Sequence, residues 1–170
     1  MTGTQMDVST PAVDGDAFRD ALSLLASPLT IVTTRDQDGH PYGFTASSVT
    51  SVSLDPPLVL VGISHTSSCF AALSTSSEFV INVLGGEDRD LARRFATSGA
   101  DRFADVRHED WPDSATPFLP DVAVAWRCET VSRIPVGDHD LLIGKLVGLR
   151  RPDTGTSPLL WYQRGFRTSD

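Results

Sequence analysis

Runs of β-branched and apolar residues, bounded mostly by Pro, Gly, Ser or Asp, recur along the chain. The first run is Leu29–Thr34, and the turn residues Asp36–Gly39 follow it before Pro41 and Tyr42 begin another extended stretch. β-Branched residues favour strands, whereas Asp and Gly favour tight turns, so this region predicts a hairpin. Further strands are expected at Ala46–Ser53, Leu58–Ile63, Phe79–Leu84, Val122–Ile134, Asp140–Arg150 and Leu159–Tyr162.

Helical periodicity is confined to three short segments. Apolar residues from Phe18 to Leu25 recur at helical spacing behind the possible caps Asp14 and Asp16, and Pro28 ends the pattern. The other two helices are predicted at Ser68–Ser74 and Asp88–Thr97. Because helices are too few to alternate with the strands, we expect a mainly β fold with a few α-helices, an antiparallel barrel capped by helices.

The chain is expected to form one domain over residues 15–168. Residues 1–14 are polar and lack an apolar period, which predicts a flexible N-terminal leader. Residues 98–120 are rich in Asp, Pro and Arg, and Phe103, Trp111 and Phe118 are their scattered apolar anchors. A loop of this length is often functional.

Composition and charge narrow the classes of function. The 170 residues are 40% hydrophobic, and no apolar run approaches the ~18–20 residues that span a bilayer, so no membrane location is expected. The formal charge of −8 disfavours nucleic acid. The N-terminus lacks a secretory signal, which favours the cytoplasm.

Metal sites are not expected from the spacing of Cys and His. Cys69 and Cys128 are far apart and are interpreted as buried thiols. The histidines His40, His65 and His108 form no metal-binding spacing with one another or with a carboxylate pair, although folding could bring them together.

Two groups of hydroxyl residues could hold an anionic ligand. Thr45–Ser48 follow Gly43 beside a strand, and Ser53 and Leu54 precede a rigid Pro-Pro corner. Thr66, Ser67 and Ser68 enter a short helix whose first N–H groups could attract an oxyanion. Ordinary strand residues and simple N-capping are the alternatives.

A histidine and two arginines are further candidates. His139 offers one ring nitrogen as a donor and the other as an acceptor, and Asp138 could orient the ring; a turn histidine without chemistry is the alternative. Arg93 and Arg94 could form a phosphate clamp, but adjacent residues point to different helix faces, so at most one can reach a given site, and a solvated position is favoured for Arg93. Trp111, Trp126 and Trp161 could be core residues or could stack on a ligand ring.

Several segments, in the same order along the chain, resemble motifs of the flavin reductase-like, FMN-binding split-barrel family. The resemblance extends from about Phe18 to Phe166. The matching segments are Gly43–Ser48, Val52–Val61, Phe79–Leu84, Leu91–Phe95 and Gly137–His139 with the following Leu141–Gly144. The resemblance implies a homodimeric, antiparallel split β-barrel with flavin near the subunit interface.

The resemblance also implies residue roles. Thr45, Ala46, Ser47, Ser48, Ser53 and Leu54 would contact the flavin ribityl chain and ring edge. Thr66, Ser67 and Ser68 would approach the phosphate, with Arg94 beside it, and His139 with Asp138 would lie near the nicotinamide. Two departures from the family are Cys69, where a hydroxyl residue is common, and His65, where a basic side chain is common.

The function implied is an NAD(P)H:flavin oxidoreductase that transfers hydride to FMN or FAD and supplies reduced flavin to a separate flavin-dependent monooxygenase. The chain lacks a G-x-G-x-x-G motif, so NADH or NADPH would bind over the flavin in the same cleft. The sequence leaves open the choice of flavin and of nicotinamide nucleotide. A protein that holds FMN tightly, or binds flavin without reducing it, is the alternative.

Overall fold

The computed structural model of the protein describes residues 13–152 and 155–169. Residues 1–12 of the expected leader therefore lie outside the described residues. The helices and strands are, in order, α1 (Gly15–Leu22), β1 (Ser27–Pro28), β2 (Thr30–Arg35), β3 (Pro41–Ala46), β4 (Val49–Leu54), β5 (Pro57–Ser64), α2 (Phe70–Thr75), β6 (Glu78–Val83), α3 (Arg89–Ala96), β7 (Glu109–Asp110), β8 (Pro117–Phe118), β9 (Val124–Val136), β10 (His139–Arg150), β11 (Leu159–Tyr162) and β12 (Gly165–Thr168).

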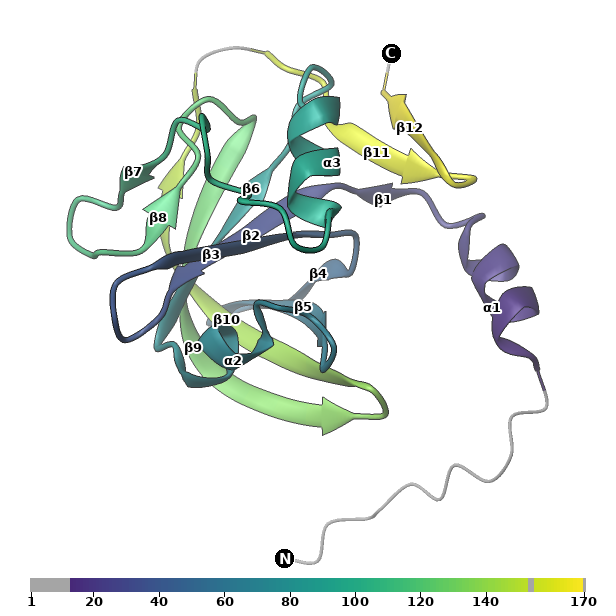
Figure 1. Cartoon of the computed structure of the whole chain (residues 1–170), viewed down its shortest axis with the longest axis horizontal. Helices are drawn as coiled ribbons and strands as arrows, with labels where there is room; N and C mark the ends of the chain where they lie inside the picture. The colour runs from purple at the N-terminus through teal and green to yellow at the C-terminus, as the bar shows by residue number, and fades with distance from the viewer. Residues whose placement is uncertain (1–12, 153–154, 170) are drawn as a thin grey trace, which may run out of the picture.

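One seven-stranded sheet forms the body of the molecule. Its order is β3-β2-β6-β9-β10-β5-β4, and every neighbouring pair is antiparallel. The edge strands β3 and β4 are consecutive in the chain, so the sheet curves until its two edges approach at one corner (Figure 1). The small sheets β1-β11-β12 and β7-β8 complete the strands of the described residues. The mainly β, antiparallel prediction is confirmed.

The core lies in two clusters, one on each side of the curved sheet. Phe95 of α3 belongs to one cluster, and Phe79 of β6 belongs to the other; neither side chain is exposed. Helix α3 packs directly on β3 because Gly43 has no side chain: a Cβ there would lie 2.7 Å from Phe95 Cε1. Cys69 and Cys128 are buried free thiols, as predicted, and burial raises the pKa of Cys128 to about 12.

Helix α1 begins where the sequence predicts but ends earlier. The side chain of Asp14 accepts hydrogen bonds from the backbone N–H groups of Asp16 at 2.8 Å and Ala17 at 3.1 Å. The helix stops at Leu22 rather than Leu25, and none of its residues is buried. Figure 1 shows it standing away from the sheet. No helix in the described part of the chain is long and apolar enough to cross a bilayer.

Other boundaries also differ from the prediction. The expected strand Ala46–Ser53 is divided, because Ala46 ends β3 and β4 begins only at Val49. Helix α2 begins at Phe70 rather than Ser68, because residues 64–68 form a hydrogen-bonded turn. The expected loop at residues 98–120 contains the short pair β7-β8. Its apolar anchors do pack as expected: Trp111 and Phe118 are buried, and the ring of Phe103 lies 5.1 Å from that of Phe95.

Candidate functional site

The hydroxyl segment at the end of β3 forms the corner between the two edge strands. Thr45 Oγ1 donates to the Ala92 carbonyl at 2.7 Å, which ties β3 to α3. Ala46 is buried, and its carbonyl accepts from Thr30 Oγ1 at 3.0 Å. Ser47 and Ser48 are exposed at the corner itself. A ligand would therefore meet Ser47 and Ser48 before Thr45 or Ala46.

Ser48 and His139 both lie beside Gly62 of β5. Ser48 Oγ accepts from the Gly62 N–H and donates to the Gly62 carbonyl, both at 3.2 Å. A Cβ added at Gly62 would lie 3.3 Å from Ser48 Oγ and 3.9 Å from His139 Cδ2. His139 occupies this position because it opens β10, opposite Ser64 at the end of β5. Folding thus unites two candidates that are distant in sequence.

Asp138 fixes one ring nitrogen of His139. His139 Nδ1 and Asp138 Oδ1 are 2.7 Å apart, and the side chains are 45% and 90% exposed. The hydrogen bond and the charge of His139 lower the pKa of the Asp138 carboxyl below its ordinary value. Because this contact occupies Nδ1, Nε2 is the ring nitrogen that a ligand would meet.

The turn between β5 and α2 carries the three predicted phosphate contacts. Ser64 Oγ and Thr66 Oγ1 are 3.0 Å apart, so these hydroxyls bind each other. Ser67 Oγ accepts from the Cys69 N–H at 3.2 Å. Ser67 therefore stabilises the turn that precedes α2, whose N-cap is Cys69, while Ser68 is exposed at a neighbouring cavity.

Sequence reasoning missed Arg102, which lies in that cavity beside Ser68. Arg102 Nη1 donates to the Gly43 carbonyl at 2.8 Å and lies 3.1 Å from Cys69 Sγ. The cavity has a volume of about 570 Å³. Its lining is His40, Pro41, Tyr42, Gly43, Ser68, Cys69, Ala100, Asp101, Arg102, Phe103 and Ala104. The position of Arg102 in the long 98–120 loop was the available signal, but nothing in the sequence distinguished it from Arg107.

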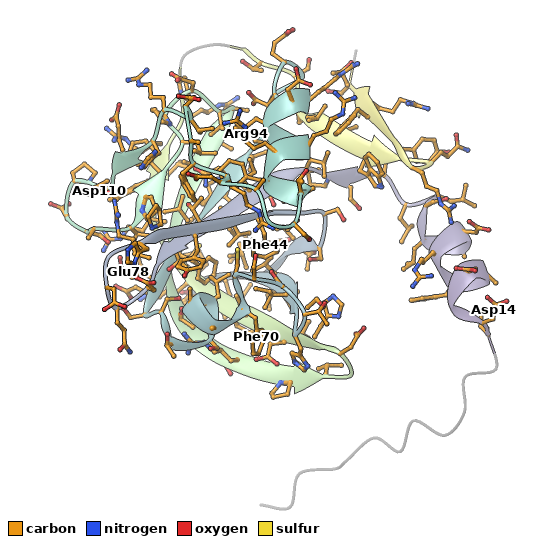
Figure 2. The ribbon with its side chains drawn as sticks, viewed as in Figure 1. Asp14, Phe44, Phe70, Glu78, Arg94 and Asp110 are labelled. Atoms are coloured by element: carbon orange, nitrogen blue, oxygen red, sulfur yellow. The ribbon has the colours of Figure 1, made fainter. Side chains whose placement is uncertain are left out.

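The two arginines of α3 face different surroundings, as their adjacency predicts. Arg94 donates to the Ala104 carbonyl. Figure 2 shows Arg94 well apart from Phe70, which begins the helix after the Thr66–Ser68 turn. Arg93 lies over the ring of Phe166, 4.9 Å from its centroid, and pairs with Asp90 at 2.8 Å.

A second cavity of about 350 Å³ lies beside Arg93. It is mainly apolar and includes two predicted flavin contacts and one tryptophan. Its lining is Leu29, Thr45, Ser47, Ala92, Arg93, Ala96, Trp161 and Phe166. Among the three tryptophans, Trp161 is therefore the one that shares a cavity with Thr45 and Ser47.

Ser53 and Leu54 lie at the other end of β4 from Ser48. They pair with Leu58 and Pro57 of β5, whereas Val49 pairs with Val61. Leu54 is six residue steps along the chain from Ser48, which is about 20 Å in an extended strand. The Leu54 side chain is 93% exposed. The structure therefore brings Ser48, but not Leu54, to His139.

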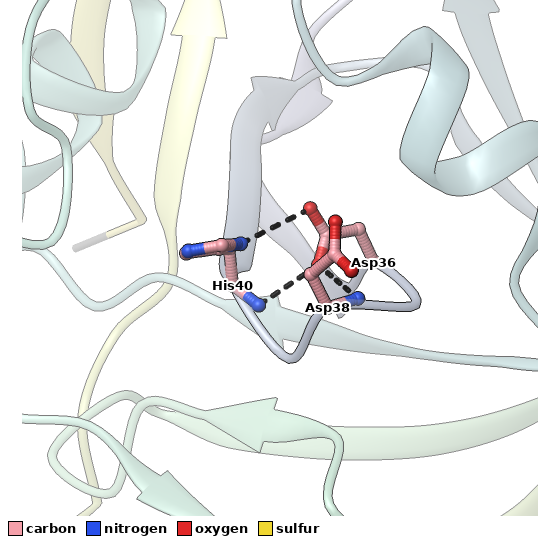
Figure 3. Close-up of side chains that lie close together, drawn as sticks. All are labelled: Asp36, Asp38 and His40. Carbon is pink, nitrogen blue, oxygen red and sulfur yellow. Dashed lines mark hydrogen bonds and ion pairs between the residues drawn. The ribbon is translucent and has the colours of Figure 1, made fainter.

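The β2–β3 turn gathers three potential metal ligands, which the sequence spacing did not indicate. One ligand atom from each of Asp36, Asp38 and His40 lies within 4.8 Å of the others (Figure 3). Asp36 Oδ1 already accepts from the N–H groups of Asp38 at 3.0 Å and His40 at 2.8 Å. These bonds explain the turn by themselves, and the expectation of no metal stays a prediction.

Comparison with known proteins decides the family. A model described as flavin reductase like domain matches residues 22–170. The chain belongs to this family. The NADH:riboflavin 5'-phosphate oxidoreductase of Streptomyces pristinaespiralis is 50% identical over 168 residues, which are 99% of this chain and 95% of that protein.

The chain is also similar to a reductase component of a monooxygenase and to a flavin reductase of known structure. The reductase component of the flavin-dependent trigonelline monooxygenase of Acinetobacter baylyi is 42% identical over 131 residues, 76% of this chain and 41% of that protein. The NADH:FAD oxidoreductase of Streptomyces globisporus, solved with NAD and FAD fragments, has a TM-score of 0.84 and 27% identity, covering 93% of this chain and 96% of that chain. The predicted flavin reductase family and split-barrel fold class are confirmed.

Proposed function

We propose that this flavin reductase uses NADH to reduce FMN and releases the reduced flavin to a separate monooxygenase. The observation that carries the proposal is the convergence of Ser48, Gly62 and His139 at the end of β5. The 50% identity to an NADH:riboflavin 5'-phosphate oxidoreductase supports the choice of NADH and FMN over NADPH and FAD. FAD remains a second acceptor to test, since a structural relative is named for it.

The β3–β4 corner fits the polar edge of a flavin ring. Ser47 and Ser48 are exposed there, and we propose that their backbone N–H groups face the ligand. Preorganised N–H groups stabilise negative charge that develops as a ring is reduced. Ser48 Oγ is engaged with both polar groups of the Gly62 backbone, so its role is to fix the corner.

The cavity beside Ser68 fits the flavin phosphate. The Arg102 guanidinium supplies charge, and Ser68 lies on the same cavity wall. Charge-assisted hydrogen bonds from arginine to phosphate are stronger than bonds between neutral groups. We therefore propose Arg102, with Thr66, Ser67 and Ser68 nearby, as the phosphate partner in place of Arg94.

His139 positions the nicotinamide. With Nδ1 held by Asp138, Nε2 is the ring nitrogen that would bind a carboxamide near Gly62 and Ser48. Flavin, when bound, supplies the hydride acceptor, and the protein contributes alignment and exclusion of water. Ser53 and Leu54 would contribute to a flavin site only from the far end of β4.

A second copy of the chain completes this proposal. Apolar side chains are exposed on α1 (Phe18, Leu22), on β4 (Val52, Leu54) and on β9 (Val131, Ile134, Val136). Large exposed apolar surfaces mark interaction sites. We propose a homodimer that covers them.

Two other expectations from the sequence also stay predictions: one domain over residues 15–168, and a cytoplasmic location.

Anaerobic stopped-flow absorbance tests the activity. The purified chain with FMN or FAD is mixed separately with NADH and NADPH, and the oxidised flavin band is followed. Rapid, saturable bleaching with NADH and FMN is expected. Flavin binding without bleaching would instead favour a flavin-binding protein.

Release of reduced flavin needs its own test. Reductase and monooxygenase separated by a dialysis membrane should still oxidise substrate at a reduced rate if the flavin diffuses. Stoichiometric flavin retained through extensive dilution would instead identify a tightly held prosthetic group.

A further inference from the structure

A second histidine–carboxylate pair lies directly beside His139 and has no role in the function described so far. His65 Nε2 and Asp140 Oδ1 are 2.8 Å apart. His65 follows the end of β5, and Asp140 is the second residue of β10. The His65 backbone N–H also donates to the Asp138 carbonyl at 2.9 Å. His65 therefore contacts the residue on each side of His139.

The surroundings hold both members of this pair in place. The Asp140 side chain is 11% exposed, and a carboxylate so far removed from water needs a hydrogen-bonding partner. The His65 ring packs edge-to-face on Phe70, with centroids 5.0 Å apart. The imidazole is thus fixed between the first residue of α2 and the carboxylate of β10.

This position links two parts of the site that are separate in sequence. His65 directly precedes Thr66–Ser68, the turn beside the proposed phosphate cavity. Through Asp138 and Asp140 it is joined to the hairpin that presents His139. A shift of His65 would therefore move the phosphate side of the site relative to the nicotinamide side.

We propose that His65, held by Asp140, is a positioning residue that sets the distance and orientation of His139 relative to the flavin. The inference rests on the proposed roles of His139 and of the phosphate cavity. Hydride transfer depends steeply on alignment, so loss of the pair slows transfer even when both ligands are bound. His65 acts through His139, and its effect disappears when His139 is absent.

Two substitutions separate the hydrogen bond from the ring. His65→Phe keeps an aromatic ring against Phe70 but removes the donor to Asp140. His65→Gln places an amide N–H near the position of Nε2 and preserves the bond. If His65→Phe does not fold, His65→Asn replaces it, because its shorter side chain cannot span to Asp140.

The experiment measures the hydride-transfer rate at saturating NADH by anaerobic stopped flow, the dissociation constant for FMN by fluorescence quenching, and the thermal midpoint. Each His65 variant is made in the wild-type chain and in His139→Ala. We expect His65→Phe to slow transfer about tenfold, and His65→Gln to recover most of the rate. FMN affinity should change much less than the rate.

The double variant is the decisive comparison. In the His139→Ala background, His65→Phe should cause no further loss of rate, because the two residues act as one unit. An equal loss in both backgrounds, or a wild-type rate in His65→Phe, would overturn the positioning role. A wild-type protein that binds FMN but never transfers hydride would overturn the proposed function and this inference together.

Discussion

At the scale of single residues, folding changes which candidates belong together. His139, Asp138 and Ser48 could be named from sequence, and the structure places Ser48 and His139 on either side of Gly62. Arg102 could not be assigned in the same way, because its partners are the Gly43 carbonyl and Cys69 Sγ, both far away in sequence. Local patterns identify chemical groups, whereas long-range contacts decide which of them meet.

Substitution of His139 tests the nicotinamide site. We expect His139→Ala to lower the rate of NADH-dependent FMN reduction by about 10–100-fold, because alignment is lost, with little change in FMN affinity. Stopped-flow bleaching and fluorescence quenching measure the two effects. Lys145→Ala, an exposed change on the same strand, is the control. Unchanged kinetics would remove His139 from the site.

The phosphate site is tested by comparing two arginines with two flavins. Arg102→Gln should weaken FMN binding about tenfold, since a charge-assisted contact is lost, and leave binding of riboflavin nearly unchanged. Arg94→Gln, whose side chain donates to the Ala104 carbonyl, should have a smaller effect on FMN. Fluorescence titration measures all four dissociation constants. A larger FMN defect in Arg94→Gln would make Arg94, and not Arg102, the phosphate partner.

At the scale of elements, the sequence predicted where helices and strands occur better than it predicted the residues at which they end or the strands with which they pair. The 29–46 hairpin appears as β2 and β3 with turn residues where Asp and Gly stand. Helix α1 ends early because Leu22, Leu24 and Leu25 find no core in their own chain. The pairing of β6 with β2 and β9 had no local signal, because apolar periodicity does not specify a strand's partner.

Glu78 connects β6 to β9 and to the 113–116 turn. Its carboxylate should make the free energy of unfolding depend on pH. Burial opposes ionisation, but hydrogen bonds from Arg127, Ser114 and Thr116 lower the pKa of its carboxyl below 4.5. The arginine contact is 2.8 Å. A lowered folded-state pKa gives stability that is present above the unfolded value and is lost as pH falls through the folded one.

We therefore expect Glu78→Gln to destabilise the protein by about 1–3 kcal/mol at pH 7 and by less near pH 3. Urea unfolding at both pH values measures the difference. Glu129→Gln, an exposed change on β9, is the control. A loss that is equal at the two pH values would show that ionisation of Glu78 contributes nothing.

At the scale of the whole molecule, the described residues form a curved sheet with one helix that has no buried side chain. The fold class could be predicted from the ratio of strands to helices. The position of α1 away from the sheet could not be predicted, because its amphipathic pattern indicates only that some apolar surface covers it. Within the chain, α1 is tied mainly to the β11–β12 turn, through Arg164 and Asp20 and through the bond from Gln163 N to Ser23 O at 2.7 Å.

The exposed face of α1 is the place to test the proposed homodimer. Phe18 is 56% exposed and Leu22 is 45% exposed, yet both would be covered if the helix packs on a second copy. The double variant Phe18→Ser, Leu22→Ser should therefore shift the protein toward monomer, while each protomer stays folded. Ala17→Ser on the same helix is the matched control.

Sedimentation velocity over a range of concentrations measures the shift, and NADH-dependent bleaching is recorded on the same samples. A stable interface of ordinary size buries roughly 1,200–2,000 Å², so removing two apolar anchors should raise the dimer dissociation constant at least about tenfold. If flavin lies near the subunit interface, its affinity falls together with dimerisation. A wild-type chain that is monomeric at full activity would contradict both the dimer and the interfacial flavin site.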